Sequence, residues 1–342
     1  MVLALAKEMA LRKSEIKDKI KTIYFGGGTP SVLSNEDLNF LIDQVYQNYD
    51  VINNPEITLE ANPDDLTTER IRQLAQTKIN RLSIGIQSFY EEDLQLMNRA
   101  HNAVQAGTCL KEAIKYFTNI TIDLIYGIPD MSEQRWTQNI KTALSFGIPH
   151  ISSYALTVEP RTALRKLIDK GKINPPKDEV AEKHFFILAE KLKENGFIHY
   201  ELSNFGKEGF FSKNNTSYWL GKKYIGIGPS AHSYNGMYRS WNIANNPIYI
   251  KTIEAGNLPS ESEELSLSDR YNEYIMTGLR TIWGVSLDKI KTDFGEEYYD
   301  YLLKTSRKLL SNGLLENNGQ IITVSPEGKF LSDGIASELF MV

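Results

Sequence analysis

The chain has 342 residues, enough for one large domain and a smaller one, and its 41% hydrophobic and 24% charged residues are typical of ordinary globular proteins. A formal net charge of −5 and an isoelectric point of about 5.7 argue against a dedicated nucleic-acid-binding protein. The apolar runs are too short to span a membrane, so we expect no integral membrane segment.

Cys109 is the one cysteine of the chain, so no intramolecular disulfide can form. This fits a reducing compartment, and the N-terminal residues do not form a secretory signal, so we expect a cytoplasmic protein. One thiolate cannot supply the ligands of a structural zinc site or an iron–sulfur cluster. Cys109 lies in a helical pattern over residues 104–117, and we expect it to be a small, buried core residue.

In chain order, short runs rich in β-branched residues alternate with helical patterns. A helix is predicted over residues 2–17, and since no capping residue precedes it, we expect the chain to begin inside a structural unit. Strands are predicted at 20–25, 56–61, 81–86, 120–126 and 150–157, and helices from Ser34, from about Thr67, over 90–98 and 104–117, and from Ser132. Alternation with short connections predicts a parallel sheet covered by helices.

The first strand runs directly into Gly-Gly-Gly-Thr-Pro at residues 26–30. Three consecutive glycines give up packing and cost backbone entropy, and Pro30 prevents the strand from continuing. We interpret the stretch as a strand end that opens toward a ligand; the alternative is a plain β-turn. It is neither a P-loop, which needs Lys-Ser/Thr after its last glycine, nor a GxGxxG dinucleotide fingerprint.

Polar groups recur where the predicted strands end, at residues 26–29, 60–63, 87–88, 123 and 154. In parallel α/β folds, ligands bind beyond the carboxyl ends of the strands. Asp123 stands within an apolar run, and a buried carboxylate is costly without a partner. We therefore favour a functional role for Asp123, Glu60 and Arg99 over the alternatives of a loop-capping or solvated charge.

Beyond residue 158 the alternation loosens. An amphipathic helix is predicted over 177–195, strands at 199–203 and 224–228, and a linker between Pro247 and Pro259. From Ser268 the pattern predicts three helices, a hairpin around residues 317–319 and a final helical turn, which suggests a winged-helix-like module without a DNA reader's basic cluster. We thus predict a barrel over residues 1–205, a connecting region over 206–260 and a C-terminal domain over 261–342.

Several stretches taken together resemble a known family. They are GGGTP (26–30), EITLEANPD (56–64), NRLSIGIQSF (80–89), NRAH (98–101), IDLIYGIP (122–129), HISSYALTVEP (150–160), YELSNF (200–205) and YIGIGPSAHS (224–233). In this order they resemble the oxygen-independent coproporphyrinogen III oxidase family of radical S-adenosylmethionine (SAM) proteins, and within it the HemW-type heme chaperones. The resemblance covers nearly the whole chain. It implies an α/β fold, a partial (β/α) barrel followed by a small helical, winged-helix-like domain.

The resemblance also implies a SAM site at the strand ends. Its residues would be Gly27, Gly28, Thr29, Glu60, Gln87, Arg99 and Asp123. The backbone of the glycine stretch would lie against the methionyl end of SAM, and Glu60 would accept hydrogen bonds from it. In some members of the family, the positions that match Gln87, Arg99 and Asp123 bind a second SAM molecule. The ammonium, carboxylate and ribose diol of SAM match an acidic residue, an arginine, an amide and open backbone.

The sequence departs from the family pattern in two places. The family holds a [4Fe–4S] cluster on three cysteines spaced CxxxCxxC, and this chain has no such motif. We expect the first barrel strand and its cysteine loop to be missing here, so that the chain as given cannot cleave SAM.

The second departure concerns heme. HemW-type proteins show HNxxYW, whose histidine is implicated in heme binding, whereas residues 214–219 read NNxxYW. Asn215, Tyr218 and Trp219 match the pattern, but Asn214 cannot ligate iron as an imidazole does. If heme binds, His199 and His232 are the nearest histidines that could replace the missing ligand. We include His232 among the candidate heme-site residues because it follows a glycine-rich stretch, although a histidine satisfied within the barrel or near the SAM site is the favoured alternative.

The leading interpretation is a chaperone that binds SAM and heme and delivers heme to an acceptor protein. One alternative is an oxygen-independent coproporphyrinogen III oxidase, which the NNxxYW segment disfavours. Another is a (β/α)-barrel isomerase or lyase that uses the glycine stretch for phosphate. A non-enzymatic winged-helix interaction protein is the last, and the acidic isoelectric point and polar sheet end disfavour it.

Overall fold

The structure is a computed structural model that describes all residues from 1 to 342, and the chain divides into two compact units. The first, which we call the sheet unit, comprises Thr22–Asn39 and Pro55–Ser212. The second, the terminal unit, comprises Met1–Lys21, Phe40–Asn54 and Lys213–Val342. None of the helices combines the length and the apolar character needed to cross a membrane. The domain boundaries expected from the sequence stay a prediction.

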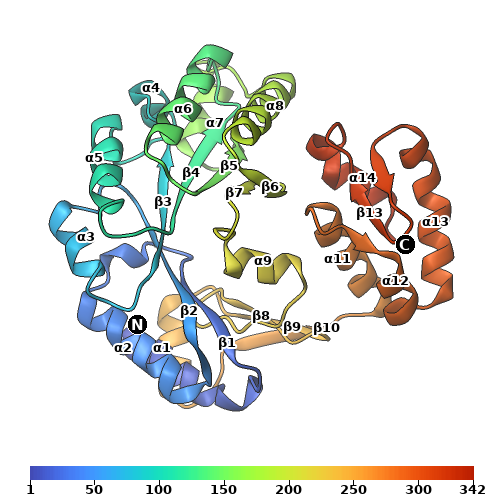
Figure 1. Cartoon of the computed structure of the whole chain (residues 1–342). Helices are drawn as coiled ribbons and strands as arrows, with labels where there is room; N and C mark the ends of the chain where they lie inside the picture. Colours follow the sequence, from blue (N-terminus) through green and yellow to red (C-terminus); the bar gives the residue numbers. More distant parts are fainter. The chain divides into compact units, whose positions relative to one another are not determined.

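A curled sheet of seven strands forms the framework of the fold, in the order β1-β2-β3-β4-β5-β7-β6 (Figure 1). The strands are β1 (Ile20–Phe25), β2 (Val51–Ala61), β3 (Arg81–Gln87), β4 (Ile120–Tyr126), β5 (His150–Ala155), β6 (Ile198–Glu201) and β7 (Asn204–Gly206). Strands β2 to β5 pair in parallel, as predicted, while β7 is antiparallel to both β5 and β6. Since parallel strands end at the same edge, their polar carboxyl ends lie together.

Helices follow the strands of this sheet, and α3, α5 and α6 cover its outer side (Figure 1). They are α2 (Asn35–Asn48), α3 (Thr68–Leu74), α4 (Glu91–Leu96), α5 (Ala103–Ala113), α6 (Glu133–Ser145), α7 (Ala163–Asp169) and α8 (Asp178–Glu194), with a 3-10 turn at Pro30–Val32. The helix starts predicted at Ser34, about Thr67 and Ser132 are confirmed: the hydroxyls of these residues each accept a hydrogen bond from a backbone N–H of the first helical turn. Cys109 is buried on α5, as expected.

The terminal unit begins with α1 (Val2–Leu11) and a 3-10 turn at Lys13–Glu15. It also contains α9 (Lys213–Trp219), α10 (Asn246–Glu254) and a three-stranded antiparallel sheet of β8 (His232–Tyr234), β9 (Tyr238–Asn242) and β10 (Ser260–Glu264). Glu8 of α1 is fully buried. Its carboxylate accepts hydrogen bonds from the Gly228 amide at 2.8 Å, the Asn242 amide group at 2.7 Å and the Tyr249 hydroxyl at 2.5 Å. These bonds tie α1 to the sheet and to α10.

The strand predicted at residues 224–228 does not form, because the side chains of Glu8 and Arg12 occupy its backbone groups. Tyr224 makes an isolated bridge to Tyr234. Beyond it, the Gly226 carbonyl accepts a hydrogen bond from Arg12 at 2.8 Å, and the Gly228 amide donates to Glu8. A side chain at position 226 would place Cβ 2.1 Å from the carbonyl oxygen of His232, so only glycine permits this approach.

The linker predicted between Pro247 and Pro259 is also wrong. Residues 246–254 form α10, and Pro247 lies in its first turn, where a missing N–H costs nothing. The Pro259 carbonyl accepts a hydrogen bond from Ile243 at 2.8 Å, next to the start of β10. Both prolines therefore begin regular elements.

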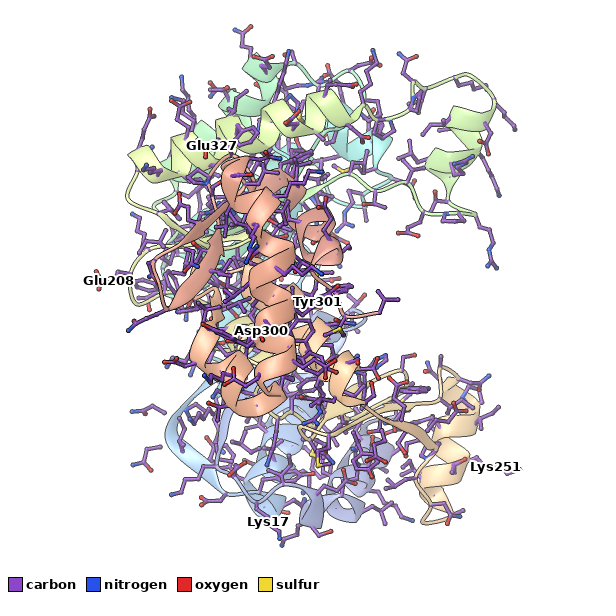
Figure 2. The ribbon with its side chains drawn as sticks, turned by 90° about the vertical axis from the view of Figure 1, so that its right-hand side faces the viewer. Lys17, Glu208, Lys251, Asp300, Tyr301 and Glu327 are labelled. Carbon is purple, nitrogen blue, oxygen red and sulfur yellow. The ribbon has the colours of Figure 1, made fainter.

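The C-terminal module confirms the predicted order of helices, hairpin and final turn. Its elements are α11 (Leu267–Leu279), β11 (Val285–Ser286), α12 (Leu287–Phe294), α13 (Glu296–Ser311), β12 (Leu315–Asn317), β13 (Ile321–Val324), a 3-10 turn at Lys329–Leu331 and α14 (Ser332–Glu338). The buried side chains of Tyr271, Ile275, Leu302 and Ile322 belong to its own core. Figure 2 labels Tyr301 on α13, whose hydroxyl donates to the Phe340 carbonyl at 2.6 Å and so fastens the end of the chain.

Candidate functional site

A small open cleft of about 100 Å³ lies where β1 to β4 end. It is lined by Gly28, Thr29, Pro30, Ser31, Glu60, Ala61, Asn62, Ser83, Gly85, Gln87 and Asp123. Most residues of the predicted SAM site are therefore brought together. Gly27 and Arg99 do not line the cleft, but each is hydrogen-bonded to a residue that does: Gly27 to Glu60 at 3.3 Å and Arg99 to Asn62 at 3.1 Å.

Glu60 is held at the end of β2 by β1 and the glycine stretch. One carboxylate oxygen accepts the Tyr24 hydroxyl at 2.7 Å and the other accepts the Gly27 amide. Burial, and then the adjacent Glu60 carboxylate, raise the pKa of Tyr24, so the phenol stays a hydrogen-bond donor. Tyr24 could not be recognised from the sequence as a site residue, because its hydroxyl follows no polar pattern.

The three glycines have different roles. At Gly26 a Cβ would come within 2.7 Å of the Tyr24 ring and 2.9 Å of the Glu60 carboxyl carbon, so this position allows the two side chains to meet. Gly27 has φ +79°, which side chains rarely adopt. Gly28 has no atom within 4 Å of an added Cβ, and it lines the cleft with open backbone. This arrangement matches the predicted opening toward a ligand.

Asp123 projects from β4 into the same cleft. Burial raises its pKa, the nearby Glu60 carboxylate raises it further, and Arg81 and Ser152 partly oppose the shift; the result is about 7. The carboxyl group therefore changes charge near neutral pH. When it is ionised, the cleft contains two carboxylates and favours a cationic ligand group.

Strand β3 places alternate residues in the cleft: Ser83, Gly85 and Gln87. Gln87 has φ +65°, a conformation that costs energy outside glycine. The buried His101 ring nitrogen Nε2 lies 3.0 Å from the Ile86 carbonyl, just before this turn. Ser83 and Gly85 were missed by the sequence analysis, although the two-residue period of a strand that ends in Gln87 indicates them.

The predicted heme-site residues lie in the terminal unit, mostly on α9. Tyr218 is 45% exposed, and its ring centroid lies 4.5 Å from that of Tyr224. The Arg280 guanidinium lies 5.6 Å from the centre of the Trp219 ring. Asn214 hydrogen-bonds to Tyr218, in place of the histidine found in the family pattern. Helix α9 thus presents an exposed tyrosine beside a tryptophan that stacks with a cation.

The two histidines considered as iron ligands differ in their surroundings. His232 is exposed on β8, with its ring 6.2 Å from that of Trp241. His199 belongs to the sheet unit, where it stacks on Phe205 at 4.0 Å and its Nε2 lies 3.0 Å from the Leu202 carbonyl. Of the two, His232 has the ring that is open to a ligand.

A [4Fe–4S] cluster does not fit the residues of this chain. Burial raises the pKa of the single thiol, Cys109, to about 12, so it is a poor source of thiolate. The structure brings together no group of three or more His, Cys, Asp or Glu side chains suited to a metal ion.

Residues 2–154 match the radical SAM superfamily, and residues 265–331 match the HemN C-terminal domain. The chain is 33% identical to the heme chaperone HemW of Bacillus subtilis, covering 92% of this chain and 84% of that protein. It is likewise 33% identical to HemW of Lactococcus lactis, covering 95% and 86%, and 30% identical to HemW of Mycobacterium tuberculosis, covering 99% and 85%.

Among solved structures, the coproporphyrinogen III oxidase HemN from Escherichia coli superposes with a TM-score of 0.82, at 21% identity, over 99% of this chain and 82% of that one. At this identity the likeness shows the fold alone. It confirms the predicted partial (β/α) barrel of the radical SAM type, and the second family match confirms the HemN-like C-terminal domain.

Proposed function

Because the chain belongs to the radical SAM, HemN-like family, with HemW heme chaperones among its relatives, we propose that it binds SAM and heme and delivers heme to an acceptor protein. The observation that carries the SAM assignment is the cleft at the ends of β1 to β4. There, two carboxylates and an open glycine backbone face the same space.

The cleft suits the amino-acid end of SAM. Sites for whole ligands measure roughly 300–1,000 Å³, so a cleft of about 100 Å³ receives one end of the molecule. Glu60 and Asp123 are placed to accept the ammonium, and Gly28 leaves room for close approach of the methionyl group. The sulfonium group of SAM is positively charged, so the two carboxylates would also stabilise it. Gln87 adds an amide that can both donate and accept.

We propose for this chain SAM binding, heme binding and heme transfer, and no chemical reaction. Because the donor set of this chain does not fit a [4Fe–4S] cluster, we derive no radical step. The oxidase alternative depends on such a step, and no particular feature of the cleft favours it. The curated relatives named above are chaperones, which supports a role in which heme is cargo.

Heme would be held by aromatic packing at α9 and by an axial ligand other than residue 214. Tyr218 and Trp219 offer flat apolar surface next to each other in sequence, and porphyrins pack well against such rings. His232 is the exposed imidazole of the terminal unit, and we assign it as the axial ligand. Asn214 contributes its hydrogen bond to Tyr218.

Heme titration followed by the Soret band tests this function, with heme transfer to apo-myoglobin as the readout of delivery. We expect stoichiometric binding by the parent chain and weaker binding by Tyr218→Ala. Tyr116→Ala is the matched control, since Tyr116 is 42% exposed but lies in the sheet unit. Equal losses in both variants would show that α9 is not the heme site. No transfer to apo-myoglobin from the parent chain would contradict delivery.

A thermal-shift series separates the proposal from the barrel-isomerase alternative. SAM should raise the melting temperature and a sugar phosphate should not, because a ligand stabilises the native state only by binding to it. The reverse result would favour the isomerase or lyase interpretation.

A further inference from the structure

We propose that Asn62 is a positioning residue that holds Arg99 at the edge of the cleft to receive the carboxylate of the ligand. This inference rests on the proposed SAM-binding function and deepens it. It places the carboxylates of Glu60 and Asp123 in the cleft and the cation of Arg99 beside the cleft, and the two charges together match an amino acid's ammonium and carboxylate.

A series of hydrogen bonds fixes the orientation of the Asn62 side chain. Its side-chain oxygen accepts from Arg99 Nη2 at 3.1 Å, and its amide nitrogen donates to Asp65 Oδ2 at 3.5 Å. The same Asp65 oxygen accepts the Ser31 hydroxyl at 2.8 Å, and Ser31 is 3% exposed. An asparagine amide suits this place, because one end accepts from a cation while the other donates to an anion. These hydrogen bonds, which we call the relay, join the 3-10 turn at Pro30–Val32, the segment after β2 and the segment after α4.

The backbone of β3 makes room for this arrangement. A Cβ at Gly85 would lie 2.8 Å from Gln87 Nε2, 3.4 Å from Arg99 Nη2 and 3.6 Å from Asn62 Oδ1. The three polar groups therefore converge over a glycine that lines the cleft. Any side chain at this position would push at least Gln87 away.

The charge of Arg99 is available to a ligand. Its hydrogen-bond partner in the chain is a neutral amide, and no carboxylate forms an ion pair with this half-buried guanidinium. A guanidinium has five N–H donors in a planar fork that matches a carboxylate, so the bond to Asn62 leaves others free. Arg99 also lies near enough to Asp123 to lower the pKa of that carboxyl group, so its positive charge acts on the space that Asp123 lines.

Isothermal titration of the full chain with SAM and with 5′-methylthioadenosine, which lacks the amino-acid end, tests the inference. Asn62→Ala should weaken SAM about tenfold, since bonds to charged groups contribute about 1.5–3 kcal/mol and 1.4 kcal/mol is a factor of ten. Methylthioadenosine affinity should not change. Asn35→Ala is the matched control, because Asn35 accepts from Arg70 at 2.7 Å in a similar pair that lies outside the cleft lining.

Asp65→Ala provides a second variant, and its effect should not add to that of Asn62→Ala, because both act through one relay. Unchanged SAM affinity in Asn62→Ala, or an equal loss for both ligands, would overturn the positioning role while leaving the SAM site in place. If the parent chain binds no SAM, the proposed function fails. The relay is then judged by ¹⁵N relaxation of the Arg99 Nε signal, which should become mobile in Asn62→Ala and stay rigid in Asn35→Ala; an equally rigid signal in both would refute it.

Discussion

Replacing Asp123 by asparagine should stabilise the protein above neutral pH and weaken its binding of SAM. The pKa of this carboxyl group rises from its ordinary value of 3.8 to about 7 in the folded chain, chiefly through burial and then through repulsion by Glu60. The folded state therefore holds a proton that the unfolded state has released. As pH rises from about 4 to about 7, the contribution of Asp123 to stability is lost, because the half-buried carboxyl group must ionise within the folded protein at a cost that the unfolded chain does not have.

The size of the effect follows from the shift. Each pH unit between the two pKa values corresponds to about 1.4 kcal/mol, so the contribution of Asp123 to stability falls by up to about 4 kcal/mol across this window and changes little beyond pH 7.5. Asparagine has no proton to lose. The stability difference between Asp123→Asn and the parent should start near zero at pH 4, increase through pH 5 and 6, and level off at about 4 kcal/mol above pH 7.

Urea unfolding followed by far-ultraviolet circular dichroism at pH 4 to 8 measures this difference directly. Asp50→Asn serves as the control for losing one negative charge, since the Asp50 side chain is 65% exposed. A difference that stays constant over the whole pH range would refute the reasoning. SAM affinity of the parent should rise through pH 7 as Asp123 ionises and attracts the ammonium, whereas the affinity of Asp123→Asn should stay low throughout.

Four further expectations can be measured independently. Glu60→Ala should weaken SAM binding by roughly 1.5–3 kcal/mol in isothermal titration, and an unchanged affinity would remove Glu60 from the site. Asn214→His should strengthen heme binding and Trp219→Ala should weaken it, as read from the Soret band; if Trp219→Ala binds like the parent, α9 loses its support as the heme site. Anaerobic reconstitution should load no [4Fe–4S] centre, because Cys109 alone can offer a thiolate, and stoichiometric iron and sulfide would contradict this. Glu8→Ala should destabilise the protein by roughly 1–3 kcal/mol in urea unfolding, because it leaves the buried donors of Gly228, Asn242 and Tyr249 without their acceptor while Arg12 keeps its ion pair with Glu15, and an unchanged stability would show that the chain relaxes around the change.

Local sequence patterns determined the regular elements around the cleft. The bounds of β1 and the starts of α2, α3 and α6 were predicted correctly, because apolar periodicity and helix-starting signals act within a few residues of the chain. The polar residues at the strand ends were also visible, since Asp123 and Gln87 interrupt apolar runs. From the alternation of strands and helices, a parallel sheet follows, and such a sheet gathers these residues at one edge.

Hydrogen bonds between residues distant in sequence determined the features that local patterns did not predict. Residues 224–228 read as a strand, yet the Gly228 amide bonds to Glu8, 220 residues away, and no local pattern reveals such a partner. The pairs Tyr24–Glu60 and Asn62–Arg99 likewise join segments 36 and 37 residues apart. Each polar group in these pairs needs a partner once folding removes it from water. Composition and period indicate that such a group will be buried, but only the order and register of β1 to β4 determine which partner it meets.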